Sequence, residues 1–462
     1  AIKRIYMKLI VPELEINEDS PFSSDLFERE KFAEKLTNLI RNVEDNLVIS
    51  LDANWGEGKS TFIRMWRLHL KNQGIKTVCF DAFKNDYSND PFLDIAGEVF
   101  SFTDTEFSEN DEIISSKGQL KSKAVNVGKR LVGWTAKVAV KTATLGAIKD
   151  SDIEELQDVA KDISKDSGDL VSNVILDRLN NHEVDKNSIE VFNKNIEELG
   201  TKIRNAQGFP LLIIVDELDR CRPSYAVETI EKIKHLFSAK NVVFVLTINK
   251  KQLQESIRSV YGEIDAATYL KKFIHLEASL PRRHGYNQTN DYLQYSSYLY
   301  RALDFPDWLT KNEDDICRIF ACYAEYYNLT LRDMERAYTN LAIYYASVSA
   351  NTINYLPVIC FLSIIKVKST VSFKMLKDSK YTYNEFEEEF SIQNISKDYY
   401  RDVYPEYFTT CFKFFLYNDE EYQKEKQSTD LQYMNLGGAS ISRKKVIPWY
   451  CDQIDAFNVN IA

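Results

Sequence analysis

The stretch Ala53-Asn54-Trp55-Gly56-Glu57-Gly58-Lys59-Ser60-Thr61 decides how the rest of this 462-residue sequence is interpreted. It nearly matches the phosphate-binding pattern G-x-x-x-x-G-K-[ST], in which a glycine-rich turn leads from a strand into a helix. The departure is Ala53, which stands in place of the first glycine. A methyl group is tolerated there unless the backbone needs a positive φ.

The sequence on either side of the loop has the context that such a pattern needs. Residues 47–51 are an apolar run typical of a buried strand, and the apolar residues of 61–71 recur at helical spacing, as do those of 24–41. A strand-to-helix turn presents backbone N–H groups and a helix N-terminus to phosphate oxygens. We therefore predict that the loop binds a nucleotide through Trp55, Gly56, Glu57, Gly58, Lys59, Ser60 and Thr61.

Two side chains of the loop have specific predicted roles. Lys59 would reach the β- and γ-phosphates, and the Ser60 hydroxyl would hold Mg²⁺.

A second motif follows the apolar run 211–215, which ends in Asp216-Glu217. This is the Walker B arrangement, in which Asp216 would complete the Mg²⁺ shell and Glu217 would polarise the attacking water. The alternative is a buried strand whose two terminal carboxylates are merely solvated, but it would have to coincide with a phosphate loop. Asn249 follows the apolar run 241–247, at a position where a side chain could sense the γ-phosphate. Strand ends are often polar, so Asn249 has a purely structural alternative.

The order of elements predicts the fold class. Apolar strands at 47–51, 77–80, 211–215 and 241–247 alternate with helical segments, which indicates an α/β fold with a parallel sheet covered on both faces. We divide the chain into an N-terminal part of the core at 1–102, a long and mostly helical insertion at 103–206, the rest of the core at 207–284, and a mostly helical C-terminal region at 285–462.

Composition limits the classes of function. The net charge of −11 gives no overall basic footprint for nucleic acid. Seven scattered cysteines without a C-x-x-C pair, and no signal peptide, favour a reduced, cytoplasmic location. The longest apolar run, 355–365, is too short to span a bilayer, so we expect a buried helix there.

The insertion has a strong charge asymmetry. Residues 115–149 contain eight Lys or Arg and no acid, whereas 150–169 contain eight acids. We favour a hairpin in which the basic arm pairs with the acidic arm. The alternative is a basic surface for nucleic acid, an anionic membrane surface or a partner subunit.

Four motifs together resemble the KAP-type P-loop NTPases, in particular their small bacterial and prophage members. They are Trp55-Gly56-x-Gly58-Lys59-Ser60, then Phe80-Asp81-Ala82-Phe83 with 86–91, then Asp216-Glu217-Leu218-Asp219-Arg220-Cys221, and finally 269–274 with Leu280-Pro281. The resemblance covers residues 25–281. Ala53 and Glu217 depart from it, since a glycine and an aspartate are usual at these positions, but a glutamate still reaches toward a water.

The resemblance implies an activity and a context. It implies Mg²⁺-dependent ATP hydrolysis that drives a conformational switch, with ATP and Mg²⁺ bound and with a homo-oligomer or another protein as partner. Some members of the family exclude infecting phage, so anti-phage defence is the implied role. Related proteins often carry transmembrane helices in the insertion, but Lys137 and Lys141 interrupt the apolar run here, so we expect no span.

The segment 331–336 resembles the helix that supplies a second sensor arginine in such NTPases. Arg332 and Arg336 lie four residues apart and would share one helical face. The alternative is that both are solvated and pair with neighbouring acids. Arg220 likewise has a structural alternative, in which it pins Asp219.

Two other functions stay open at this point. A nucleotide-gated interaction scaffold would bind ATP with little turnover, and a P-loop kinase would transfer the phosphate to an acceptor. The Asp216-Glu217 pair favours a site that activates water, and the sequence shows no acceptor pocket.

Overall fold

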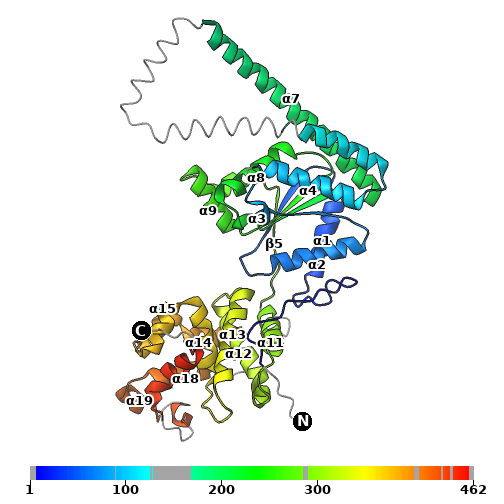
Figure 1. Ribbon diagram of the computed structural model, residues 1–462. Helices are drawn as coiled ribbons and strands as arrows, with labels where there is room; N and C mark the ends of the chain where they lie inside the picture. Colours follow the sequence, from blue (N-terminus) through cyan, green and yellow to red (C-terminus); the bar gives the residue numbers. More distant parts are fainter. Residues whose placement is uncertain are drawn as a thin grey trace.

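A five-stranded parallel sheet forms the centre of one half of the molecule (Figure 1). The computed structural model describes residues 7–88, 90–124, 127, 168–284, 290–399, 405–427, 430–436 and 441–456. The strand order is β2-β3-β4-β1-β5. The strands are β1 (Leu47–Asp52), β2 (Val78–Asp81), β3 (Leu211–Asp216), β4 (Val242–Ile248) and β5 (Leu276–Ser279). The predicted parallel sheet is confirmed.

The burial of each strand explains whether it could be predicted from the sequence. All seven residues of β4 are buried, and only the last residue of β3 is not, because both strands lie inside the sheet with helices on each face. The edge strand β5 pairs only with β1, and three of its four residues are exposed. It has no apolar run, which is why the sequence did not predict it.

Helices cover both faces of the sheet, and we call this unit the sheet domain. Leu212 and Ile214 of β3 point to one face, where they join the core formed with α1 (Glu30–Arg41) and α2 (Lys59–Asn72). Ile213 of β3 points to the other face, as the twofold alternation of a strand requires. That face is covered by α4 (Pro91–Glu106), α7 (Gly168–Gln207), α8 (Pro223–Leu236) and α9 (Lys250–Tyr261). The short elements are α3 (Ala82–Asn85), η1 (Leu218–Arg220) and α10 (Ala266–Leu270).

The strand register brings the predicted site residues to one edge. Strand β4 lies between β1 and β3 and pairs with both in parallel, so the carboxyl ends of all three strands meet. Asp81 at the end of β2 lies opposite Asp216 at the end of β3. In open parallel sheets, ligands bind at this edge.

Most of the charged insertion lies outside the described residues. Of the basic segment 115–149, the structure describes only 115–124 and 127, and of the acidic segment 150–169 only 168–169. The predicted pairing of the two arms therefore stays a prediction. The helix α7 that follows is 40 residues long and extends well beyond the sheet domain (Figure 1).

The described residues between 290 and 456 form a separate bundle of helices, which we call the helical region. Its core is a continuous cluster of buried aromatic and aliphatic side chains, in which Phe361 contacts Tyr323, Phe386 and Phe412. Residues 356–365 of α14 are all buried, so the expected buried helix is confirmed. The α-helices are α11 (Asp291–Ala302), α12 (Glu313–Tyr326), α13 (Leu331–Ser347), α14 (Leu356–Lys368), α15 (Thr370–Lys377), α16 (Tyr383–Phe390), α17 (Ile392–Tyr399), α18 (Pro405–Leu416), α19 (Asp419–Glu425) and α20 (Val446–Ile454), with 3₁₀ turns η2 (Asp307–Asn312), η3 (Asp430–Tyr433) and η4 (Arg443–Lys445).

An extended segment joins the two halves. We call residues 7–20 the strap. Its beginning is held by the helical region, where the Lys8 backbone N–H donates to Leu303 and the Leu9 carbonyl accepts from Thr339. Its later part is held by α2, through bonds from Arg64 to Glu13 and from Asn72 to Glu18. Among the described helices, none combines the length and apolarity needed to cross a membrane.

Candidate nucleotide site

In the phosphate loop, residues 53–60, two glycines take backbone conformations with positive φ. Gly56 and Gly58 have φ values of 83° and 80°, and Gly58 is the N-cap of α2 in the left-handed conformation. Ala53 is not among the residues with positive φ, and its N–H donates to the Ile248 carbonyl at 3.2 Å. The methyl group at the first pattern position therefore imposes no strain.

The loop also lies against the start of α13. The Arg332 N–H donates to the Gly56 carbonyl at 3.2 Å. A Cβ atom at Gly56 would lie 2.6 Å from the Arg332 Cβ. Gly56 is thus required both for its φ and for this close approach between the sheet domain and the helical region.

Lys59 begins α2 and points back over the loop. Its ammonium donates to the Ala53 carbonyl at 2.5 Å and to the Asn54 carbonyl at 3.5 Å. Burial lowers the pKa of Lys59, and the nearby Asp219 and Asp52 carboxylates oppose that shift. The charge is therefore poorly solvated, which favours exchange of the loop carbonyls for a phosphate.

A cavity of about 110 Å³ lies between the loop and the end of β3, and we call it the phosphate cavity. It brings together most of the residues that the sequence predicted for the site. Its lining consists of Asn54, Trp55, Gly56, Gly58, Lys59, Ser60, Thr61, Asp216, Glu217, Asp219, Arg220 and Arg332.

The two Walker B carboxylates have different surroundings. Asp216 accepts hydrogen bonds from the Glu217 N–H, at 2.9 Å, and from the Thr247 hydroxyl. Glu217 has a φ of 61°, and its carboxylate accepts from the Ser60 hydroxyl at 3.2 Å and pairs with Arg220 at 2.6 Å. Desolvation raises the pKa of Glu217 and Asp216 adds to the shift, whereas Arg220 and Ser60 lower it.

Trp55 joins the two motifs directly. Its indole N–H donates to the carboxylate of Asp219, a buried residue of η1. In the structure Arg220 pairs with Glu217, and the partner of the Asp219 carboxylate is Trp55.

The sequence comparisons agree with this geometry. Residues 29–348, more than half of the chain, match the KAP family P-loop domain. The chain belongs to the KAP family. Membership in this P-loop family supports nucleotide binding.

One curated relative adds a biological context. Over 156 residues the KAP chain is 22% identical to the "Phage T7 exclusion protein" of Escherichia coli (strain K12). The alignment covers 34% of this chain and 21% of that protein, so the matched part spans about a fifth of the relative's length.

Two motifs of the KAP resemblance meet in the structure. Arg222, just after η1, donates through its Nε to Asp86 at 2.8 Å and through its backbone N–H to the same carboxylate at 2.8 Å. The segment after β2 is therefore fixed to the turn that carries Glu217 and Asp219.

Glu57, predicted to bind nucleotide, does not line the phosphate cavity. Its carboxylate pairs with Arg282 at 3.2 Å, and its carbonyl accepts from Arg29 at 3.3 Å. Burial raises the pKa of Glu57, while Arg282 and Arg29 lower it. Arg282 also donates to the Leu329 carbonyl at 3.1 Å, so it fastens the loop to the helical region. The sequence did not indicate Arg282, although it directly follows the KAP-like Leu280-Pro281.

Asn249 and Arg336 lie apart from the phosphate cavity. The Asn249 amide oxygen accepts from the Gln252 N–H at 3.3 Å and caps α9. Arg336 is exposed on α13, whereas Arg332, one turn earlier, lines the cavity. On β4, Thr247 is the residue that contacts Asp216.

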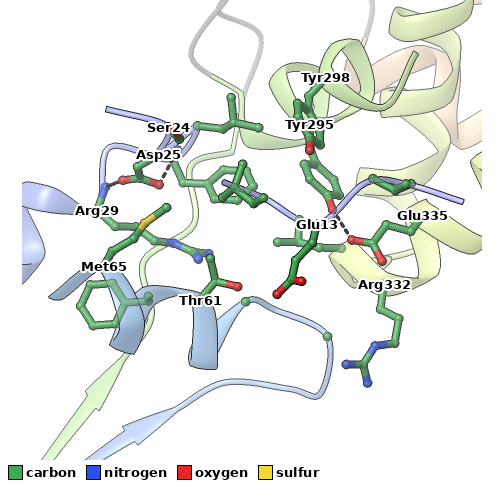
Figure 2. Close-up of a pocket in the computed structure, with 18 of the residues that line it drawn as sticks. Glu13, Ser24, Asp25, Arg29, Thr61, Met65, Tyr295, Tyr298, Arg332 and Glu335 are labelled. Atoms are coloured by element: carbon green, nitrogen blue, oxygen red, sulfur yellow. Dashed lines mark hydrogen bonds between the residues drawn. The ribbon is translucent and has the colours of Figure 1, made fainter. Parts of the chain in front are cut away.

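A larger cavity of about 420 Å³ lies on the other side of the loop, and we call it the adjoining cavity (Figure 2). It shares Gly56, Gly58, Thr61 and Arg332 with the phosphate cavity. The strap, the turn before α1, the first turns of α2, and helices α11 and α13 form its walls. Besides the shared Thr61 and Arg332, the polar and aromatic side chains that line it are Glu13, Ser24, Asp25, Phe27, Arg29, Phe62, Tyr295, Tyr298 and Glu335.

Proposed function

We propose that this KAP protein hydrolyses ATP in the presence of Mg²⁺ and uses the reaction to change the contact between its sheet domain and its helical region. The observation that carries the proposal is the meeting of Ser60 and Glu217 in the phosphate cavity, 3.2 Å apart. A metal-binding hydroxyl and a water-activating carboxylate thus face the same small space beside Lys59.

The residues present fit a bound Mg²⁺. The Ser60 hydroxyl and the Asp216 carboxylate supply the oxygen ligands that Mg²⁺ prefers, and both line the phosphate cavity. When bound, the ion would offset the negative charge of the phosphates. Thr247 and the Glu217 N–H orient Asp216, while Glu217 can accept a proton from water.

The adjoining cavity suits the nucleoside part of ATP. Its volume lies within the usual range for small-molecule sites, about 300–1,000 Å³. Tyr295 and Tyr298 supply aromatic surface, and the Glu13 and Asp25 carboxylates can accept hydrogen bonds from an amino group. Because both cavities share Gly56 and Gly58, one nucleotide can occupy them together.

The switch rests on contacts between the loop and the helical region. Gly56 is bonded to Arg332 at the start of α13, and Glu57 is bonded to Arg282, which also donates to the Leu329 carbonyl of the helical region. A shift of the loop when the γ-phosphate leaves would therefore change the position of the helical region. The similarity to the phage exclusion protein supports a role of this switch in anti-phage defence inside the cell.

Three substitutions test the reaction. Lys59→Ala should abolish ATP binding, because Lys59 is the lysine that lines the phosphate cavity. Glu217→Gln should bind ATP but release phosphate about 10²–10⁴ times more slowly, the usual loss when a general base is removed. Asp216→Ala should weaken the Mg²⁺-dependent part of binding. Nucleotide binding and phosphate release by the full chain measure these effects.

Matched controls separate these effects from a general change in charge. Lys31→Ala and Glu34→Gln alter exposed residues of α1 and should leave both measurements unchanged. If the parent protein binds ATP without releasing phosphate, the scaffold function replaces the ATPase. If the phosphate appears on an acceptor rather than in solution, the kinase function does.

A further inference from the structure

A surface hollow beside α2 has basic side chains as half of its lining, and we call it the basic hollow. Its volume is about 360 Å³, and it shares no lining residue with the phosphate cavity or the adjoining cavity. Four of its eight lining residues are basic in a chain whose net charge is −11. The lining residues are Arg64, Arg67, Leu68, Lys71, Ile75, Lys76, Thr77 and Glu106.

The positive charge of the basic hollow is only partly neutralised. Arg64 pairs with Glu13 of the strap at 3.1 Å, and Lys76 pairs with Glu106 at 3.6 Å. Within the described part of the chain, neither of the other two cations forms an ion pair with a carboxylate. Arg67 donates to the Thr77 hydroxyl at 3.4 Å, and Lys71 is exposed. Two charges are thus available to an anionic ligand.

The spacing of the cations favours a linear polyanion. Arg64, Arg67 and Lys71 follow the i, i+3, i+7 pattern and lie on one face of α2. At a rise of 1.5 Å per residue they span about 10 Å of helix. One strand of a DNA duplex carries a phosphate about every 3.4 Å along its axis, so about three phosphates occupy the same length.

A second basic element lies beside the hollow. Lys117, in the described start of the basic segment 115–149, pairs with Asp104 in the last turn of α4. Lys76 of the hollow binds Glu106 in the same turn. The described start of the basic segment therefore packs against the same turn of α4 as Lys76 of the hollow.

We propose that the basic hollow binds the phosphate backbone of nucleic acid, independently of base sequence and separately from the nucleotide site. Backbone recognition of this kind needs cations that track the strand and no contact with the base edges. A membrane surface is the less suitable partner, because surface binding to lipid also uses exposed apolar side chains. Among the described residues, none of the large exposed hydrophobic side chains lines the hollow.

The test measures binding of the full chain to short fluorescent DNA, single-stranded and duplex, by anisotropy at several salt concentrations. With about three phosphate contacts, the slope of log K against log salt should be about −2 for single strands and about −3 for duplex. Arg67→Gln combined with Lys71→Gln should weaken binding at least about tenfold and make the slope shallower by about 2.

Two controls make the result specific. Lys368→Gln combined with Lys374→Gln removes the same charge from exposed residues of the helical region and should leave DNA binding intact. Lys59→Ala should also bind DNA normally, so the proposal can hold even if the ATPase proposal fails. Unchanged thermal melting of the hollow variant, in which Lys71 is exposed and Arg67 is partly exposed, shows that it is folded.

Three outcomes would overturn the proposal. The first is no binding of either DNA at about 50 mM salt, where phosphate contacts are strong. The second is an equal loss of binding in the helical-region control. The third is binding to phosphatidylserine vesicles, lost in the hollow variant, with no binding to DNA.

Discussion

At the residue scale, Glu217 combines strain, burial and ion pairing in one side chain. A non-glycine residue held at a φ of 61° costs roughly 1–3 kcal/mol, and such residues persist where the surrounding structure holds them. Here Arg220 and Ser60 hold Glu217 in place, since both contact its carboxylate. The strained backbone directs this carboxylate into the phosphate cavity, beside Asp216.

Arg220 should therefore set the pH dependence of catalysis. As the proposed general base, Glu217 must be ionised, so activity is present above its pKa and is lost as the pH falls through it. Because burial already raises this pKa and Arg220 opposes the shift, we expect Arg220→Met to move the acidic limb of the kcat profile to higher pH. Arg220→Lys should restore much of the normal profile. A lower kcat with an unmoved limb would mean that Arg220 does not act through Glu217.

The sequence predicted the residues of the site whose chemistry is local. Lys59, Ser60 and Asp216 follow from short motifs, because the loop and the strand end fix their positions. The bonds that orient these motifs were not predictable in the same way. Trp55 meets Asp219 across 164 residues and Arg282 meets Glu57 across 225 residues, and neither pair leaves a local pattern.

At the scale of elements, the contact between α13 and the phosphate loop links the two halves of the molecule. The strands that could be predicted are those buried by helices on both faces, as in β3 and β4. The edge strand β5 was missed because it lacks an apolar run. The resemblance placed the helix that contains Arg332 at the site, but its backbone bond to Gly56 depends on tertiary packing and was not predicted. The structure also explains why residue 56 is a glycine, since α13 occupies the space that a side chain at this position would need.

A pair of glycine substitutions can isolate that contact. Gly56 and Gly74 both have positive φ, at 83° and 77°, so the backbone strain of alanine should cost about 1 kcal/mol of stability at either site. Only Gly56 faces another element, because a Cβ at Gly74 would meet no heavy atom of the described residues within 4 Å. We expect Gly56→Ala to weaken ATP binding at least about tenfold and Gly74→Ala to leave it unchanged. Equal affinities, measured by titration calorimetry, would show that docking of Arg332 on the loop is not needed.

At the scale of the whole molecule, the protein has separate hydrophobic cores joined by few connections. The sheet domain has one cluster on each face, and the helical region has its own. The strap, Arg282 and the start of α13 connect them. The predicted boundaries of the core, the insertion and the helical C-terminal region stay predictions, and the strap contacts were outside the reach of sequence patterns.

Nucleotide should couple the unfolding of the two halves. Without ligand we expect two thermal transitions, because each half has its own core. A non-hydrolysable ATP analogue that touches both halves should raise both transitions, by about 2.7 kcal/mol in total at a hundredfold excess over Kd. Lys59→Ala should show no shift at the same concentration. A shift confined to one transition would mean that the ligand contacts only one half.

The strap also has a consequence for how the protein is made. Leu9 bonds to Thr339, 330 residues later in the chain. At about 5–20 residues per second, a ribosome needs about 15–65 s to pass from one to the other. Throughout that interval the strap has no partner on α13 and the adjoining cavity lacks a wall. A nascent chain can thus form its sheet before the adjoining cavity has all its walls, and the proposed switch would be complete only after the helical region has emerged.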